Sequence, residues 1–180
     1  MNPMPVIAAY AALQRAAGEP LHFPGRAGHP VLREAVDADL VASALGWAAT
    51  SPEAAGGTFN LTNGDVFLWE NVWPAIAEEF GMEVGEPRPT SLAEELPRRR
   101  AEWADLVSTH ELASPGDLLE FVGENSLVYS DMLLAGAAHP SNPVLNSTIA
   151  ARQAGFRDCV DTEDMFRKWI RRMRARHLVP

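Results

Sequence analysis

The 180-residue sequence predicts an α/β fold that is mostly helical and has only a few short strands. Two observations lead to this fold class. Helical and strand-like patterns alternate in the first half, in the order helix, strand, helix, strand, helix, which is typical of α/β units. The second half reads mostly as helices. Two or three short strands make a poor independent sheet, so the chain is expected to rely on more sheet than it contains.

The first elements are a helix, a strand and a second helix. Residues 5–17 are largely apolar and predict a buried helix, and residues 21–25 predict a short strand closed by a Pro-Gly turn. Asp37 or Asp39 is expected to cap the second helix. The expected apolar face of that helix consists of Leu40, Val41, Leu45 and Trp47.

The stretch "FNLTNGDVFLWENVWPAIAEEFG", residues 59–81, predicts a strand over 58–62, a turn and a helix. The Asn63-Gly64-Asp65 turn suits either a strand-to-helix connection or a type I′ hairpin, and the helical period that follows favours the former. Apolar residues at 3/4 spacing form one stripe: Trp69, Val72, Trp73, Ile76 and Phe80. The two tryptophans could stack on a planar ligand, but their place in the stripe favours core packing.

The second half predicts mostly helices. Residues 91–112 form a charged helix that Pro97 disturbs, and Ser114 is expected to cap the next helix. Residues 125–136 suit either a buried helix or an apolar strand. The final helix has Asp161 as its cap and arginines at its end. Its arginine face could bind an anion or a membrane, but a solvated outer face is the simpler interpretation.

Composition limits the function classes. With 15 basic and 24 acidic residues the net charge is -9, which disfavours nucleic acid as a partner. The single cysteine, Cys159, cannot form an intramolecular disulfide, so a reducing, cytoplasmic location is expected. No apolar run approaches the length of a membrane span, and no secretory signal is recognised.

The sequence has no recognisable catalytic arrangement. It contains no P-loop, no G-x-G-x-x-G and no G-x-S-x-G, and the five histidines show no metal-ligand spacing, so no metal site and no catalytic residue are predicted. The adjacent pairs Glu78-Glu79 and Glu94-Glu95 are expected on solvated faces. Lys168 is the only lysine, so neither Tyr10 nor Tyr129 has a lysine four residues on.

The order of several segments resembles one family. "YAALQRAAGEPLHFPG", "DADLVASALGWAA", "FNLTNGDVFLWENVWPAIAEEFG" and the terminal "LVP" resemble the progesterone 5β-reductase and iridoid synthase-like reductases. These are atypical extended short-chain dehydrogenases/reductases, within the NAD-dependent epimerase/dehydratase group, that use NADPH to reduce enones. The resemblance runs from Asn2 to Pro180 and covers the C-terminal half of the family's chain.

The resemblance implies a single substrate-binding or lid domain over residues 1–180, without the dinucleotide-binding part. In the family the Gly-rich NADP-binding turn and the catalytic tyrosine and lysine lie upstream of the matched segment. A truncated gene, a misplaced start codon at Met1 or a deliberate fragment would each explain this. NADPH is therefore expected as the cofactor of an intact homologue, with no tight binding to this chain.

The resemblance assigns three positions of this sequence to a binding site. Asn2 matches an asparagine of the family's "MMN" segment, which implies contact with both cofactor and substrate. Val36 replaces a residue that is often serine and borders the pocket, so this wall is less polar. Tyr129 stands where the family has the phenylalanine of a "WWF" segment over the substrate, with Leu127 and Val128 in place of the tryptophans.

Two further functions are weighed beside the substrate-binding portion of an enone reductase. One is a non-catalytic module that binds a small ligand, or that self-associates through an exposed former domain interface. The other is a carbonyl-reducing or epimerase-type relative. The expected ligand is a small apolar enone or carbonyl compound.

Overall fold

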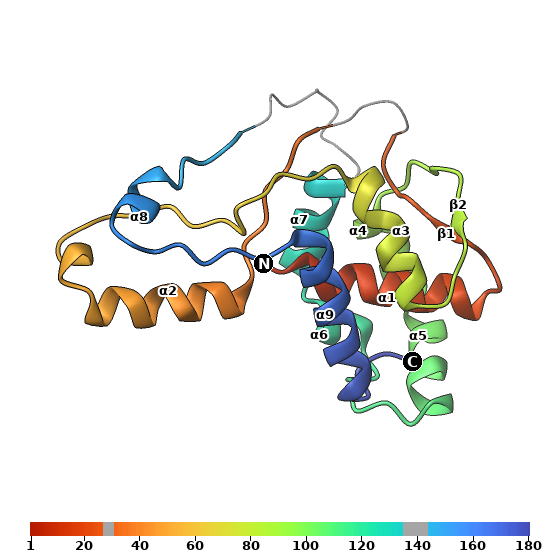
Figure 1. Cartoon of the computed structure of the whole chain (residues 1–180). Helices are drawn as coiled ribbons and strands as arrows, with labels where there is room; N and C mark the ends of the chain where they lie inside the picture. Colours follow the sequence, from red (N-terminus) through yellow and green to blue (C-terminus); the bar gives the residue numbers. More distant parts are fainter. Residues whose placement is uncertain (27–30, 135–143) are drawn as a thin grey trace. The chain divides into compact units, whose positions relative to one another are not determined.

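A computed structural model describes residues 1–26, 31–134 and 144–180 (Figure 1). These residues divide into two compact units. The first consists of residues 1–26, 69–134 and 166–180, and the second of residues 31–68 and 144–165. Helices dominate the described residues, which also contain two short parallel strands and no complete Rossmann sheet. The predicted fold class is confirmed.

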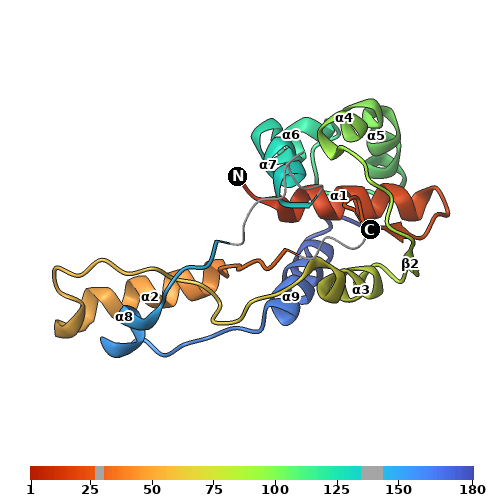
Figure 2. The same cartoon turned by 90° about the horizontal axis from the view of Figure 1, so that it is seen from above.

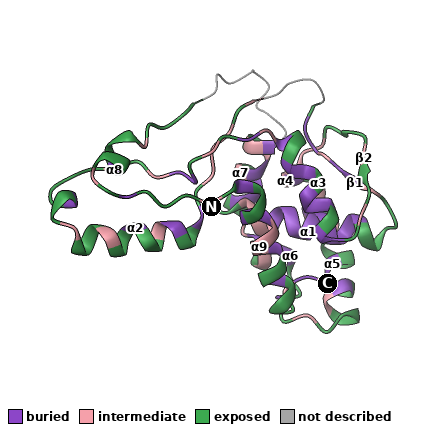
Figure 3. Cartoon of the chain, viewed as in Figure 1, coloured by how far each residue is buried: buried purple, intermediate pink, exposed green. Residues whose placement is uncertain are grey.

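Helix α1 is central to the first unit. The elements of this unit are α1 (Pro3–Ala16), β1 (Leu21–His22), α3 (Trp69–Glu79), β2 (Val84–Gly85), α4 (Leu92–Arg98), α5 (Arg100–Thr109), α6 (Leu118–Val122), α7 (Glu124–Leu134) and most of α9 (Thr162–Ala175). Figure 2 shows α4 to α7 on one side of α1, and α3 and α9 on the other. Every residue from Val6 to Gln14 is buried (Figure 3). Because other helices pack on both sides of α1, this helix needs no polar face.

The apolar stripe predicted for α3 is confirmed. Its buried members are Trp69, Val72, Trp73, Ile76 and, just after the helix, Phe80. The Trp73 indole N–H donates to the Leu21 carbonyl at 3.3 Å, and the ring lies edge-on to Phe23 at 5.2 Å. Both tryptophans therefore serve the core. The neighbouring strand β1 pairs in parallel with β2, with Leu21 opposite Val84.

Residues 91–134 are mostly helical, but the breaks differ from those predicted. The region expected as one disturbed helix is two, α4 and α5, separated at Arg99. Helix α6 is capped by Asp117, which accepts from the Leu119 amide at 2.9 Å. The predicted cap, Ser114, is wrong because its hydroxyl donates to the Leu178 carbonyl instead. The ambiguous segment at 125–136 is helical as far as Leu134, and residues 135 and 136 lie outside the described residues.

The second unit has a small core of its own. Its elements are α2 (Ala38–Thr50), the 3-10 helix η1 (Pro52–Ala54), α8 (Ile149–Gln153) and the first residues of α9. Its core consists of Leu40, Ala44, Ala151 and Phe156, with Trp47, Phe59, Leu61 and Val160 packed against them. Two predicted caps are confirmed. Asp37 accepts from the Asp39 amide at 2.9 Å at the start of α2, and Asp161 accepts from the Asp164 amide at 3.0 Å at the start of α9.

Two expectations for the second unit are wrong. Residues 58–62 form no strand; Phe59 and Leu61 instead use their alternation to pack on the helices of the unit. Leu45 is 67% exposed, because the buried face of α2 follows Leu40 and Ala44 at a spacing of four. The next position in the chain points about 100° away from that face.

The turn at Asn63 does not lead directly into a helix. Gly64 has a φ of +107°, a value that favours glycine, so the chain does change direction where predicted. Helix α3, however, begins only at Trp69. Between them Phe67 forms an isolated antiparallel bridge with Arg33.

The arginines of α9 do not form a purely solvated face. Arg171 donates to both carboxylate oxygens of Glu79, at 2.9 and 2.6 Å, and Arg167 donates to one of them at 3.3 Å. Arg174 donates to the Glu79 carbonyl at 2.8 Å. Glu79 is 8% exposed, so its predicted place on a solvated face is wrong, whereas the Glu78 side chain is 72% exposed as expected.

Candidate substrate-binding site

The start of the chain is tied to the start of α7. Asn2 caps α1, with its Oδ1 accepting from the Met4 amide at 3.0 Å. Its own backbone amide donates to the Ser126 hydroxyl at 3.1 Å, across 124 positions of sequence. Asn2 is exposed, and its Nδ2 group can donate to a ligand while Oδ1 caps the helix.

Helix α7 carries Tyr129 close to this contact. The buried Ser130 donates from its hydroxyl to the Ser126 carbonyl at 2.7 Å. Tyr129 is half-buried and follows Ser126 by three positions, so the two share one side of the helix. Val128 and Met132, at 67% and 54% exposure, add apolar surface next to it. The structure therefore brings Asn2 to the helix that carries Tyr129, through a serine that the sequence analysis missed.

The rotation of α7 about its axis is fixed by Asp131. Its carboxylate accepts from the Ser91 hydroxyl and the Leu92 amide, both at 2.6 Å, and so caps the start of α4. In this orientation Leu127 is 3% exposed and belongs to the core, whereas Val128 faces outward. Of these two neighbours of Tyr129, only Val128 presents its side chain to solvent.

Val36 lies in the second unit, immediately before the cap of α2, and is 45% exposed. The backbone amide of Asn63 donates to the Ala35 carbonyl at 2.7 Å, and the side-chain Oδ1 of Asn63 accepts from the Asp37 backbone amide at 2.7 Å. Asn63 therefore holds the backbone on both sides of Val36. From the sequence alone, Asn63 was expected only to form a turn, although an asparagine side chain can also accept and donate hydrogen bonds to residues distant in the sequence.

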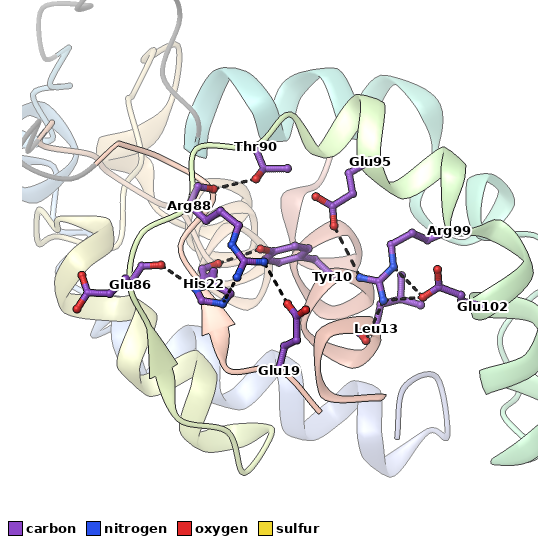
Figure 4. A network of polar contacts seen from close by, with 10 residues as sticks. All are labelled: Tyr10, Leu13, Glu19, His22, Glu86, Arg88, Thr90, Glu95, Arg99 and Glu102. Carbon is purple, nitrogen blue, oxygen red and sulfur yellow. Dashed lines mark hydrogen bonds and ion pairs between the residues drawn. The ribbon is translucent and has the colours of Figure 1, made fainter. Parts of the chain in front are cut away.

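Tyr10 is placed for packing and not for proton transfer. It is 1% exposed, and its hydroxyl donates to the His22 carbonyl at 3.1 Å (Figure 4). Burial raises the pKa of this hydroxyl. The His22 Nδ1 lies 2.7 Å from the Glu86 carbonyl oxygen, which can only accept, so Nδ1 carries the proton. The His22 Nε2 then accepts from Arg88 at 2.9 Å, and Arg88 also pairs with Glu19 at 3.1 Å. This network joins β1 to the segment after β2.

Metal binding finds no support in the described part of the chain. No group of three or more histidine, cysteine, aspartate or glutamate side chains gathers there in a way that could hold an ion. His29 and His139 lie outside the described residues. Within residues 1–26, 31–134 and 144–180, no helix has both the length and the apolar character needed to cross a membrane.

Comparison with known proteins settles the relationship. No family model matches the chain. It is 31% identical over 185 residues to an (S)-8-oxocitronellyl enol synthase of Camptotheca acuminata, and 30% identical over 184 residues to the 3-oxo-Δ(4,5)-steroid 5β-reductase of Arabidopsis thaliana. Each match covers 100% of this chain and 45% of the relative. The chain is a homologue of the iridoid synthase-like and progesterone 5β-reductases. The resemblance predicted from the sequence is confirmed.

This reductase homologue spans less than half the length of the curated relatives that it matches. A further enol synthase, of Antirrhinum majus, is 32% identical over 184 residues with the same coverage. Within the homologue, Asn2 and Tyr129 lie in the first unit and Val36 in the second. Their assignment to a pocket stays a prediction that comes from the family resemblance.

Proposed function

We propose that the chain is the substrate-binding portion of an NADPH-dependent short-chain reductase that acts on an enone or carbonyl compound. The observation that carries the proposal is similarity along the whole chain to iridoid synthase-like and steroid 5β-reductases. The hydrogen bond from Asn2 to Ser126 supports it, because it ties Asn2 to the helix that carries Tyr129, another of the three expected pocket residues.

The sequence contains no recognisable dinucleotide-binding motif. The sequence has no Gly-rich fingerprint to approach a pyrophosphate, and its only lysine, Lys168, has no tyrosine four residues before it. We therefore propose that this chain alone does not turn over and does not bind NADPH tightly. In an intact homologue the cofactor supplies a hydride to the substrate from a separate half of the protein.

The residues of this chain would provide shape and exclude water. The Asn2 Nδ2 group can donate a hydrogen bond that orients a polar group of the ligand. Val128 and Tyr129 offer apolar surface in the first unit, and Val36 offers apolar surface in the second. Apolar surface suits an apolar enone and keeps water from the reacting atoms.

Ligand-observed NMR with progesterone, a 3-oxo-Δ(4,5)-steroid, tests the proposed pocket. The unsubstituted chain should bind it saturably, and Val36→Asp should weaken binding by about tenfold or more, because a charge would replace an apolar wall. Val144→Asp is the matched control, since Val144 is also an exposed valine of the second unit, at 77% exposure. Equal weakening by both substitutions, or no binding at all, would contradict the assignment of Val36 to the pocket.

A second candidate function is a non-catalytic module that binds a small ligand or a second copy of the chain. The exposed apolar side chains of α7, Val128 and Met132, favour it. Sedimentation velocity separates the candidates. A concentration-dependent dimer that Met132→Glu abolishes, together with no weakening of progesterone binding by Val36→Asp, would favour the module.

A carbonyl-reducing or epimerase-type activity is the remaining alternative for the intact protein. This alternative shares the same cofactor half and differs in the bond that reacts. Assays of the chain combined with a cofactor-binding half, on enones and on aldehydes, would show which bond is reduced.

A further inference from the structure

Asn63 makes more contacts than a turn requires. It is fully buried, at 0% exposure. Its Oδ1 accepts from the Asp37 amide at 2.7 Å, and its Nδ2 donates to the Thr162 hydroxyl at 3.0 Å. Its backbone amide donates to the Ala35 carbonyl at 2.7 Å, and its carbonyl accepts from the Val160 amide at 2.9 Å. Forming a turn requires only local backbone geometry, so these long-range bonds point to another role.

Two of these bonds bracket a single residue. The Ala35 carbonyl and the Asp37 amide are the backbone groups on either side of Val36, and both are bound by Asn63. Three positions before Val36, Arg33 exchanges two backbone hydrogen bonds of 2.9 Å with Phe67. The backbone of Val36 is therefore held from both directions, and the direction of its side chain follows from the position of Asn63.

The other side of Asn63 is equally fixed. The Thr162 hydroxyl, which accepts from the Asn63 Nδ2, donates to the Asp65 Oδ1 at 2.6 Å. The Thr162 amide donates to the Asp65 Oδ2 at 2.9 Å. A buried polar network in which each member is satisfied is rigid, so Asn63 transmits the position of the start of α9 to Val36.

We infer that Asn63 is the positioning residue for Val36, the apolar wall of the proposed substrate pocket. The position of Val36 is inferred from the contacts of Asn63 alone. The consequence for the affinity of an apolar enone rests on the proposed function. Asn63 touches no substrate; it acts through the backbone on either side of Val36.

The Asn63→Asp variant tests the inference because its hydrogen-bonding capacity depends on pH. A protonated carboxyl can accept from the Asp37 amide and donate to the Thr162 hydroxyl, as the asparagine amide does. An ionised carboxylate cannot donate a hydrogen bond to the Thr162 oxygen, so two hydrogen-bond acceptors would face each other. The Val36 methyl NMR signals should therefore match those of the unsubstituted chain at about pH 5 and move away at about pH 8, on either side of the raised pKa of a buried carboxyl.

Two controls exclude titration of other groups. The Asp65 carboxylate binds Thr162, and the Asp37 amide binds Asn63. Both aspartates are present in the unsubstituted chain, whose Val36 signals should stay constant between the same pH values. Asn60→Asp places the same charge on an exposed asparagine three positions earlier, and it should leave the Val36 signals unchanged. Constant Val36 signals in Asn63→Asp, in a chain that is folded at both pH values, would overturn the inference.

Progesterone binding supplies the functional test. Asn63→Asp should bind the steroid about tenfold more weakly at about pH 8 than at about pH 5, the order expected for misplacing one apolar contact in a pocket. In a Val36→Ala background this pH effect should disappear, since Asn63 acts through Val36. A pH effect that persists undiminished in that background would refute action through Val36. If the unsubstituted chain binds no progesterone, the proposed function fails, while the Val36 signals still decide the positioning role.

Hydrogen exchange on the unsubstituted chain gives a measurement that needs no variant. The Asp37 amide donates to the Asn63 side chain, so its exchange should be slowed as much as that of Val41, whose amide donates within α2 to the Asp37 carbonyl. Exchange of the Asp37 amide at the rate of a free peptide would show that Asn63 does not hold this segment.

Discussion

Replacing Glu79 by glutamine tests the account of the first unit. The carboxylate is 8% exposed and accepts two hydrogen bonds from Arg171 and one from Arg167. Glutamine keeps the size of the side chain but loses the charge and one acceptor oxygen. A hydrogen bond to a charged group contributes about 1.5–3 kcal/mol. Because the Arg171 side chain is 65% exposed, water replaces part of the loss, and the free energy of unfolding should fall by about 1–3 kcal/mol.

Glu78→Gln is the matched control. Its carboxylate pairs with the same Arg167 at 2.7 Å, but the Glu78 side chain is 72% exposed. An exposed pair contributes little, so the free energy of unfolding should change by less than about 1 kcal/mol. Urea unfolding followed by far-ultraviolet circular dichroism measures both variants. An equal decrease in the two variants would refute the argument, because Glu79 is buried and is also bound by Arg171, whereas Glu78 is exposed.

The pH dependence of the Glu79 effect follows from its pKa. The hydrogen bonds from Arg171, aided by those from Arg167, hold the pKa of Glu79 below its ordinary value of 4.5. A carboxyl whose pKa is lower in the folded state contributes stability above its unfolded-state pKa, and this stability is lost as pH falls through the folded value. The gap between the unsubstituted chain and Glu79→Gln should therefore narrow below pH 4.5. A gap that stays constant on acidification would contradict the ion pair as its cause.

Four further substitutions have expected outcomes. Gly64→Ala should lower the free energy of unfolding by about 1–3 kcal/mol, because φ is +107° and a Cβ there would lie 3.2 Å from the Cys159 Cβ. Gly46→Ala lies inside α2 with open space around it and should raise the free energy of unfolding by about 0.5–1 kcal/mol. The opposite order of the two variants in urea unfolding would contradict this. Trp73→Phe should cost about 1–3 kcal/mol, because the indole hydrogen bond is lost from the core, and a neutral result in the same assay would contradict its role. Tyr10→Phe should remove a loss of stability at alkaline pH. Burial raises the pKa of Tyr10 in the folded chain above its ordinary value of 10.0, so the stability of the unsubstituted chain declines as pH rises through this raised pKa. Identical alkaline unfolding profiles of the two chains would contradict this.

Features set by local periodicity could be predicted from the sequence. The α3 stripe and the buried character of α1 were available from residue spacing, since the side-chain period of a helix alone decides which positions share a face. Leu45 shows the limit of this reasoning. It belongs to an apolar helix, but which side of α2 is covered depends on Ala151 and Phe156, more than 100 positions away.

Long-range polar contacts could not be predicted. Glu79 was expected beside Glu78 on a solvated face, because nothing in the local sequence distinguishes the two adjacent acids. Their difference depends on Arg167 and Arg171, which α9 brings to α3 only in the folded chain. The strand expected at 58–62 failed for a related reason: within the described residues no neighbouring strand pairs with it.

In the candidate site, too, some features could be predicted from the sequence and others could not. Asn2, Val36 and Tyr129 came from the family resemblance, not from any local pattern of chemistry. The residues that hold two of them in place, Ser126 for Asn2 and Asn63 for Val36, are visible only in the structure. Both act through backbone groups, which leave no signal in the sequence.

Calorimetric titration of the purified chain with NADPH tests the central claim most directly. We expect no stoichiometric binding, because the sequence contains no Gly-rich dinucleotide fingerprint and no tyrosine four residues before its one lysine, Lys168. Saturable binding of one NADPH per chain would contradict the proposal that this chain is the substrate-binding portion alone.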